Sequence, residues 1–157
     1  MSNKIMTIQL KSGNVKILLR PDLAPKHCER IEQLAKEGFY DHCPFHRVID
    51  GFMAQTGDGV NQDGTGGSSY PDLTQEFSSH PHKRGVVSMA RAQDPNSANS
   101  QFFICYTDCP HLDNQYTVFG EVESGMDLVD GLKKGHPGSG VVADPDCMES
   151  VTVEESV

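Results

Sequence analysis

The sequence predicts a mainly β protein built as a closed or nearly closed antiparallel barrel with two helical caps. Two observations support this fold class: about six to eight short strand-like runs divided by turn-rich stretches, and only two segments with helical spacing. Many short strands are typical of barrels, in which closure removes exposed sheet edges. The chain of 157 residues is the size of one domain, so we expect residues 1–157 to fold around one core.

A hairpin and a helix are predicted at the start of the chain. Apolar and polar residues alternate in residues 6–10 and again in residues 15–19, with Gly13 as a turn signal between them. Apolar residues then recur with helical spacing from Pro25 up to Gly38. Proline suits the first turn of a helix and glycine its end, so this segment is the first helical cap.

The middle of the chain is predicted to be a long surface loop followed by three strands. Residues 57–67 contain five glycines among polar residues and have no apolar periodicity. Strand-like runs follow at residues 85–90, 102–106 and 116–122, each bounded by turn-forming residues.

A second helix and a last strand are predicted in the C-terminal part. Ser124 is a good N-cap, Asp127 falls in the first helical turn, and the apolar pattern continues towards Gly135. Residues 148–153 alternate again. We therefore expect a helix over residues 124–135 and then a strand.

Charge and cysteine content indicate the compartment and exclude some partners. The net charge of −9 disfavours nucleic acid, because phosphate binding needs a basic surface. We expect no signal peptide and no membrane span, since no apolar stretch is long enough for either. The cysteines are odd in number and scattered: Cys28, Cys43, Cys105, Cys109 and Cys147. Reduced thiols in a cytoplasmic protein fit this pattern best.

The glycines, cysteines and histidines do not have the spacing of a nucleotide or metal site. Gln62 stands where a dinucleotide fingerprint that starts at Gly57 needs its third glycine. The cysteines at positions 105 and 109, and the neighbouring histidines, lack the paired spacing of a structural zinc site. We expect no metal, and packing roles for the cysteines.

One arginine interrupts a strand of large apolar residues. Arg47 stands among β-formers in a run that ends at the turn signal before Gly51. In the next run, strand alternation places Met53 and Gln55 on one face. Phe52 belongs to the opposite face unless the chain bends at Gly51. A lone arginine in a strand most simply points into solvent, and the alternative is a functional site.

Two adjacent aromatic residues favour the alternative of a site. Phe102 and Phe103 open a strand, and neighbours in a strand face opposite sides. If Phe102 fills the barrel, Phe103 is left for an outer apolar pocket, which Phe52, Met53 and Leu112 would join.

At these segments the chain closely resembles the cyclophilin family of peptidyl-prolyl cis-trans isomerases. The matching motifs keep their order and approximate spacing, at residues 45–49, 51–58, 64–67, 96–97 with 100–104, 112–113 and 118–120. The resemblance implies an eight-stranded antiparallel closed β-barrel capped by two α-helices. It also implies a site on the outer wall, because side chains fill the interior.

The resemblance implies roles for individual residues. Arg47 is similar to the catalytic arginine, and Gln55 to the amide that anchors the substrate backbone. The implied proline pocket comprises Phe52, Met53, Phe103 and Leu112, the implied main-chain contact Ala90 and Arg91, and the implied rim or floor Gln101, His111 and Tyr116.

Three of these positions depart from the common pattern of the family. His111 stands where many members have a tryptophan, Tyr116 replaces a frequent histidine, and Arg91 replaces a common asparagine. The tryptophan contributes apolar surface and an indole donor to binding of cyclosporin-type inhibitors. We therefore expect inhibitor binding to be weakened and turnover to be retained.

The resemblance implies an isomerase that accelerates rotation about X-Pro peptide bonds and assists protein folding. Catalysis would be non-covalent, through electrostatic stabilisation of the twisted amide, with no cofactor. The expected partners are proline-containing peptides and unfolded or folded client proteins, and the expected state is a monomer. Two alternatives remain open: a proline-binding chaperone or scaffold without essential turnover, and a metal or thiol sensor at Cys105 or Cys109.

Overall fold

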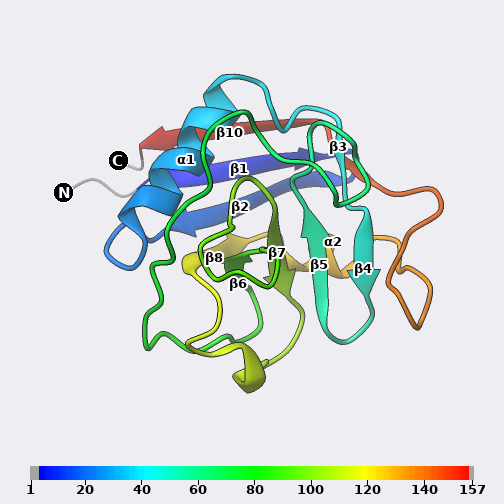
Figure 1. Cartoon of the computed structure of the whole chain (residues 1–157). Coiled ribbons are helices and arrows are strands. Elements are labelled where there is room, and N and C mark those ends of the chain that lie inside the picture. Colours follow the sequence, from blue (N-terminus) through cyan, green and yellow to red (C-terminus); the bar gives the residue numbers. More distant parts are fainter. Residues whose placement is uncertain (1–3, 156–157) are drawn as a thin grey trace.

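Eight antiparallel strands form one curved sheet in the computed structural model, which describes residues 4–155 (Figure 1). The described residues contain ten strands, eight of them in this sheet: β1 (Lys4–Leu10), β2 (Gly13–Leu19), β3 (Cys43–Pro44), β4 (Arg47–Ile49), β5 (Met53–Thr56), β6 (Val86–Met89), β7 (Phe102–Cys105), β8 (Val118–Ser124), β9 (Cys147–Met148) and β10 (Ser150–Glu155). The helices are α1 (Pro25–Lys36), the short 3-10 helix η1 (Pro110–Leu112) and α2 (Met126–Asp130). Strands β3 and β9 form a separate two-stranded ribbon.

The order of strands in the sheet is β10-β1-β2-β8-β6-β7-β5-β4. The predicted mainly β fold with eight antiparallel strands and two α-helices is confirmed, but the word "closed" overstates it. Among the described residues, no ladder joins β4 to β10. Part of the edge of β4 is instead covered by the loop before β9, since Val48 N donates to Gly140 O at 2.8 Å and Arg47 forms an isolated bridge with Val141.

The interior of the curved sheet is filled by side chains. Phe102 packs edge-to-face on Tyr40 and on Phe119, with ring centroids 5.6 and 5.9 Å apart. All three side chains are fully buried, and the Tyr40 hydroxyl donates to Ser100 O at 2.7 Å. Such a packed interior leaves no room for a ligand, so a binding site must lie on the outside of the sheet.

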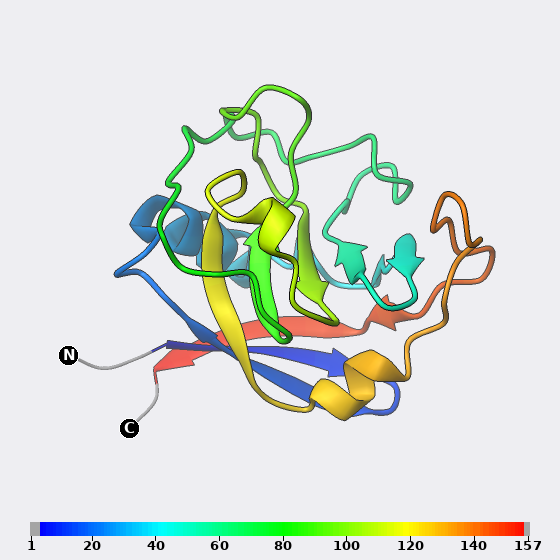
Figure 2. The same cartoon turned by 90° about the horizontal axis from the view of Figure 1, so that it is seen from below.

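Most predicted elements are observed where the sequence placed them. The hairpin β1–β2, helix α1, and strands β6, β7 and β8 match the predicted segments to within a few residues. The tail forms two strands rather than one, because Glu149 interrupts it and donates its N–H to Gln9 O at 2.7 Å. Figures 1 and 2 show α1 against one opening of the barrel and α2 beside the hairpin turn.

The second helix is shorter than predicted. It spans only Met126–Asp130, and its N-cap is Gly125 at a φ of 90°, not Ser124. Ser124 is the last residue of β8 and pairs with Lys16, so its backbone belongs to the sheet. Within residues 4–155, neither α-helix is long and apolar enough to cross a membrane.

Candidate active site

A bend at Gly51 brings two consecutive side chains to the same outer surface. Gly51 has a φ of 75°, which a side-chain-bearing residue rarely adopts, and Phe52 N donates to Ile49 O at 3.0 Å in the resulting turn. Phe52 therefore precedes β5 and is free of its alternation. Phe52 and Met53 both pack in an apolar cluster outside the barrel, as a bend at Gly51 predicts.

Strand alternation places the other apolar walls. On β5 and β7, Ala54 and Ile104 face the interior, whereas Met53 and Phe103 face outwards. We name the apolar side chains outside the barrel the outer cluster: Met53, Phe103, Cys105, Cys109 and Leu112, with Ile49, Phe52, Ala90 and Tyr116 packed against them. Its members come from β4, β5, β7, η1 and neighbouring turns.

A small pocket opens on the outer cluster. Its volume is about 150 Å³, and nine of the predicted site residues line it: Arg47, Phe52, Met53, Gln55, Ala90, Arg91, Phe103, Leu112 and Tyr116. This space is below the size of typical cofactor sites, and it suits one small apolar ring. The structure thus brings the predicted wall residues together around one cavity.

The guanidinium of Arg47 is held at the edge of this pocket by two acceptors. Arg47 lies directly opposite Gln55 in the β4–β5 ladder, and its Nη1 donates to Gln55 Oε1 at 3.3 Å. Its Nε donates to the carbonyl oxygen of Ser139 at 3.2 Å. No hydrogen bond within the described part of the chain uses Nη2, so this group can donate to a ligand.

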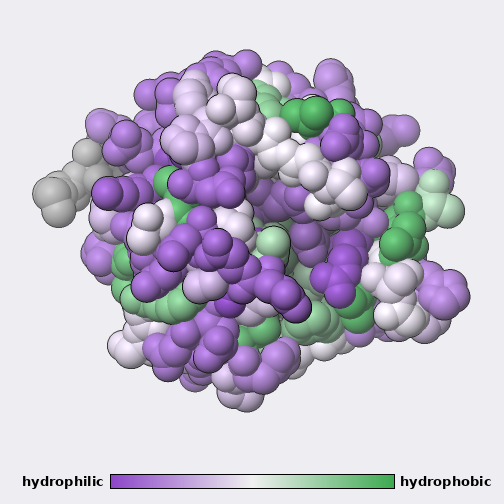
Figure 3. Space-filling view, in the orientation of Figure 1, coloured by the Kyte–Doolittle hydropathy of each residue, from purple (hydrophilic) through white to green (hydrophobic). Residues whose placement is uncertain are grey.

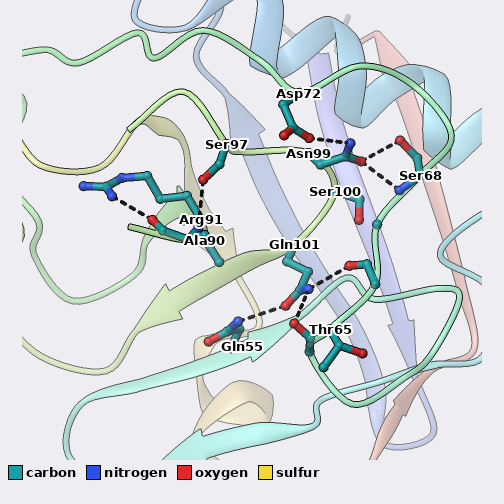
Figure 4. Close-up of a pocket in the computed structure, with 14 residues that line it drawn as sticks. Gln55, Thr65, Ser68, Asp72, Ala90, Arg91, Ser97, Asn99, Ser100 and Gln101 are labelled. Atoms are coloured by element: carbon teal, nitrogen blue, oxygen red, sulfur yellow. Dashed lines mark hydrogen bonds between the residues drawn. The ribbon is translucent and has the colours of Figure 1, made fainter. Parts of the chain in front are cut away.

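Gln55 is oriented in turn by Gln101. Gln55 Nε2 donates to Gln101 Oε1 at 3.0 Å, and Gln101 Nε2 donates to the carbonyl oxygens of Gly64 and Gly66, both at 2.9 Å (Figure 4). Gln101 does not line the small pocket. It lies in a neighbouring polar cavity of about 420 Å³, which shares Gln55, Ala90 and Arg91 with the pocket. Figure 3 shows this hydrophilic face hollowed near its middle.

Two of the departures from the family pattern contact each other. The guanidinium of Arg91 lies over the Tyr116 ring, 4.6 Å from its centroid, and its Nε donates to Gln115 O at 3.1 Å. The side chain points away from Gln55 in Figure 4. Arg91 therefore supports one wall of the pocket through Tyr116, with a cation–π contact that steadies the ring.

His111 lies outside the pocket that the other side chains form. It is exposed, and its ring packs on Phe52 with centroids 5.6 Å apart. The structure therefore places His111 on the outer side of Phe52, whereas Phe52, Leu112 and Tyr116 line the pocket itself.

A buried histidine supports the pocket from behind. The His82 ring is nearly parallel to Phe103, at 16° and 6.4 Å. Its Nδ1 lies 3.0 Å from Asp113 Oδ1 and its Nε2 lies 3.0 Å from Ser88 Oγ. Burial lowers the pKa of His82 although Asp113 opposes this effect, which favours the neutral ring. Since Asp113 follows Leu112, His82 links two walls of the pocket.

The sequence prediction missed several contributors. Cys105 and Cys109 pack behind the pocket, and Cys105 could have been found, because it lies two residues after Phe103 and shares its face. Burial raises the pKa of both thiols, the reverse of what a reactive thiol needs. Ser139 had no local signal at all. Among residues 4–155, no group of three potential ligands is placed to hold a metal ion.

Sequence comparisons give one consistent result. A family profile described as cyclophilin type peptidyl-prolyl cis-trans isomerase/CLD matches residues 5–154. A Brucella suis protein named probable peptidyl-prolyl cis-trans isomerase is 55% identical over 158 residues, which cover 94% of this chain and 81% of that protein. A Gallus gallus protein named peptidyl-prolyl cis-trans isomerase-like 3 is 44% identical, with coverage of 82% and 81%.

Solved structures with the same fold agree with the sequence relatives. A cyclophilin type peptidyl-prolyl cis-trans isomerase of Cryptosporidium parvum has a TM-score of 0.89 at 27% identity, with all of both chains covered. A structure of the same protein in the presence of the dipeptide Ala-Pro has a TM-score of 0.87 at 28% identity, with coverage of 97% and 99%.

Proposed function

The chain belongs to the cyclophilin-type peptidyl-prolyl cis-trans isomerases, and we propose that its isomerase reaction is catalysed by Arg47 with Gln55 as the substrate anchor. The family activity is acceleration of rotation about X-Pro peptide bonds. The observation that carries the residue assignment is one charged guanidinium, held by two acceptors, at the edge of an apolar pocket sized for a small ring.

The reaction needs no nucleophile. Partial double-bond character opposes rotation by roughly 18–20 kcal/mol, whereas the two X-Pro isomers differ by only about 1 kcal/mol. In the twisted amide, conjugation is lost and the proline nitrogen becomes more basic. An enzyme must therefore hold the proline ring and supply a donor that binds the twisted state more strongly than the planar one.

The proposed mechanism assigns these two tasks to different parts of the site. The apolar walls formed by Phe52, Met53 and Phe103 fix the proline ring by excluding water from it. Gln55 holds the flanking substrate backbone together with the main chain at Ala90 and Arg91. Arg47 donates to the proline nitrogen, or to its carbonyl side, as the bond twists. In a partly dry pocket such a donor contributes several factors of ten in rate.

We extend the proposal to partners and context. The Ala-Pro dipeptide reported with the Cryptosporidium parvum protein supports proline-containing peptides as ligands of this chain too. We propose that residues 1–157 act as one monomeric isomerase domain on unfolded and folded client proteins. A cytoplasmic location is supported by five cysteines that are all free thiols, four of them buried.

Inhibitor binding is proposed to be weak rather than lost. His111 supplies less apolar surface than the tryptophan of many relatives, and it is exposed beside Phe52. The pocket walls that such an inhibitor would contact are present. A moderate loss of affinity is the expected result.

The experiment that tests the assignment is exchange NMR on an Ala-Pro peptide. Arg47→Ala should lower the catalysed exchange rate by about a hundredfold or more, and Arg47→Lys should restore little, because a point charge cannot reproduce the planar fork. Arg84→Ala is the matched control, since Arg84 is a surface arginine paired with Asp130. Equal rates for wild type and Arg47→Ala would remove Arg47 from the mechanism.

The same variant separates turnover from binding alone. A chaperone or scaffold that needs only the pocket would support client refolding equally well with Arg47→Ala, although the peptide exchange rate had fallen. An isomerase would lose both, since refolding limited by proline isomerisation is slow without a catalyst. The measurement is the refolding rate of a client protein limited by proline isomerisation, with wild type and with Arg47→Ala.

A further inference from the structure

The loop that follows β5 is organised around one buried carboxylate. We propose that Asp58 is a positioning residue, which orients Arg47 through this loop and the amides of Gln101 and Gln55. This inference rests on the proposed function, because it concerns the same guanidinium. Asp58 lines neither the small pocket nor the neighbouring polar cavity, so its role would be exerted through the loop backbone and the two amides.

The Asp58 carboxylate accepts hydrogen bonds from five backbone N–H groups. Oδ1 accepts from Val60 at 3.0 Å and Asn61 at 2.9 Å, and Oδ2 from Asp63 at 3.3 Å, Gly64 at 3.0 Å and Gly66 at 2.9 Å. The residue is fully buried. This one side chain therefore satisfies backbone donors at five positions of the loop, alongside the hydrogen bonds that Thr65 makes with Asn61 and Asp63.

The carboxylate is ionised in the folded protein. Burial by itself would raise the pKa of Asp58, but the N–H groups of Gly66, Asn61, Val60 and Gly64 outweigh burial and hold this pKa far below its usual value. A negative charge surrounded by N–H donors makes each of these hydrogen bonds stronger than a neutral one.

Two glycines connect the carboxylate to the site. Gly64 and Gly66 each donate their N–H to Asp58 and accept from Gln101 through their carbonyl oxygens. A Cβ on Gly66 would lie 2.5 Å from Asp58 Oδ1, and one on Gly64 would lie 2.8 Å from His46 Nε2. The loop therefore has no room for a side chain at Gly64 or Gly66, the two residues that link Asp58 to Gln101.

The connection sets the orientation of two amides. Because Gln101 Nε2 faces the two carbonyl groups, Gln101 Oε1 must face Gln55, and Gln55 then presents its Nε2 to Gln101 and its Oε1 to Arg47. If the two carbonyl groups moved, both amides could turn over. An NH₂ group would then face the guanidinium, with donor against donor. Asp58 thereby fixes which atom of Gln55 holds Arg47.

A double-mutant cycle tests this coupling. Asp58→Asn replaces one acceptor oxygen with an NH₂ group that faces N–H donors. In the wild-type background it should lower the exchange rate of a saturating Ala-Pro peptide by about tenfold to a hundredfold. In the Arg47→Ala background the loss should be clearly smaller, because no guanidinium remains to be oriented and only the anchoring by Gln55 is disturbed. Asp127→Asn is the control with the same chemistry in helix α2.

A second readout observes the arginine directly. The side-chain Nε–H signal of Arg47 should shift and exchange faster with solvent in Asp58→Asn than in wild type. A purely structural role would leave this signal unchanged in protein that stays folded. If Asp58→Asn does not fold, Gln101→Met interrupts the connection after the loop, and it should show the same dependence on Arg47.

The outcomes separate the inference from the function on which it rests. Equal losses from Asp58→Asn, or from Gln101→Met, in both backgrounds would overturn the coupling while leaving Arg47 as the catalyst. An unchanged rate in the wild-type background would overturn it as well. A rate unaffected by Arg47→Ala alone would instead remove the proposed function.

Discussion

The two faces of strands β5 and β7 are built in different ways. On the inner face, Ala54, Phe102 and Ile104 are fully buried and belong to the main apolar core. On the outer face, Met53 and Phe103 meet side chains from distant loops and turns. The inner face follows from local alternation, whereas the outer face depends on segments that the barrel brings together. Stability and catalysis are therefore separable by residue, even between direct neighbours in the sequence.

The largest expected effect is on the inner face. Phe102→Ala removes a fully buried ring that packs on Tyr40 and Phe119, so unfolding should become easier by about 3–5 kcal/mol. Phe103→Ala opens onto the pocket, and it should cost about 1–3 kcal/mol while lowering turnover more strongly. Urea unfolding and peptide exchange of both variants measure the contrast. Equal losses of stability in the two variants would break the comparison.

The next effect concerns pH and the loop beside the outer face. The pKa of Asp58 is lowered in the folded state, so its contribution to stability is complete above about pH 3.8 and is lost as the pH falls below that value. At pH 7, Asp58→Asn should be less stable than wild type by about 1.5–3 kcal/mol. The difference should shrink in acid. The urea midpoints of wild type and Asp58→Asn, measured between about pH 7 and pH 2.5, test this, with Asp127→Asn as the control. A stability difference between wild type and Asp58→Asn that stays constant over this range would contradict the prediction.

A smaller effect is expected from the loop that covers β4. Gly140 has a φ of 79°, and a Cβ there would lie 2.6 Å from Ile49 Cγ1 and 3.0 Å from Arg47 Cγ. Gly140→Ala should cost about 1–2 kcal/mol and reduce turnover by about tenfold, because it displaces the arginine. Gly138→Ala in the same loop is the matched control, since its Cβ would meet His136 Nδ1 at an ordinary 3.5 Å. Similar activity of both variants would show that this loop does not orient Arg47.

The smallest effect is expected at the rim. His111→Trp should tighten binding of a cyclosporin-type inhibitor by about tenfold, through added apolar surface and an indole donor, and it should change turnover by less than about threefold. Titration calorimetry with the inhibitor and exchange NMR with the peptide measure the two quantities. If the inhibitor affinity did not change, the weaker binding would have to come from other positions, and Tyr116 would be the first to examine.

The inner face of the sheet was predictable from the sequence, whereas much of the outer face was not. The hairpin, the first helix and the inward direction of Phe102 depend on periodicity and on turn residues, which are local properties. The end of β8 was misjudged because pairing of Ser124 with Lys16 overrode its propensity to cap a helix. The contact of Ser139 with Arg47 joins residues 92 positions apart, and no local pattern encodes it.

The pairing of the first strand with the last has a consequence for synthesis on the ribosome. Lys4 lies opposite Glu155, and β1 pairs with β10 along six positions. Strand β1 thus lacks one neighbour until residues 150–155 have been made, and synthesis from β1 to β10 takes about 8–30 s at typical translation rates. During this interval β1 and β2 have an unprotected edge that other nascent chains can pair with. The first hairpin is therefore open to mispairing until β10 is in place.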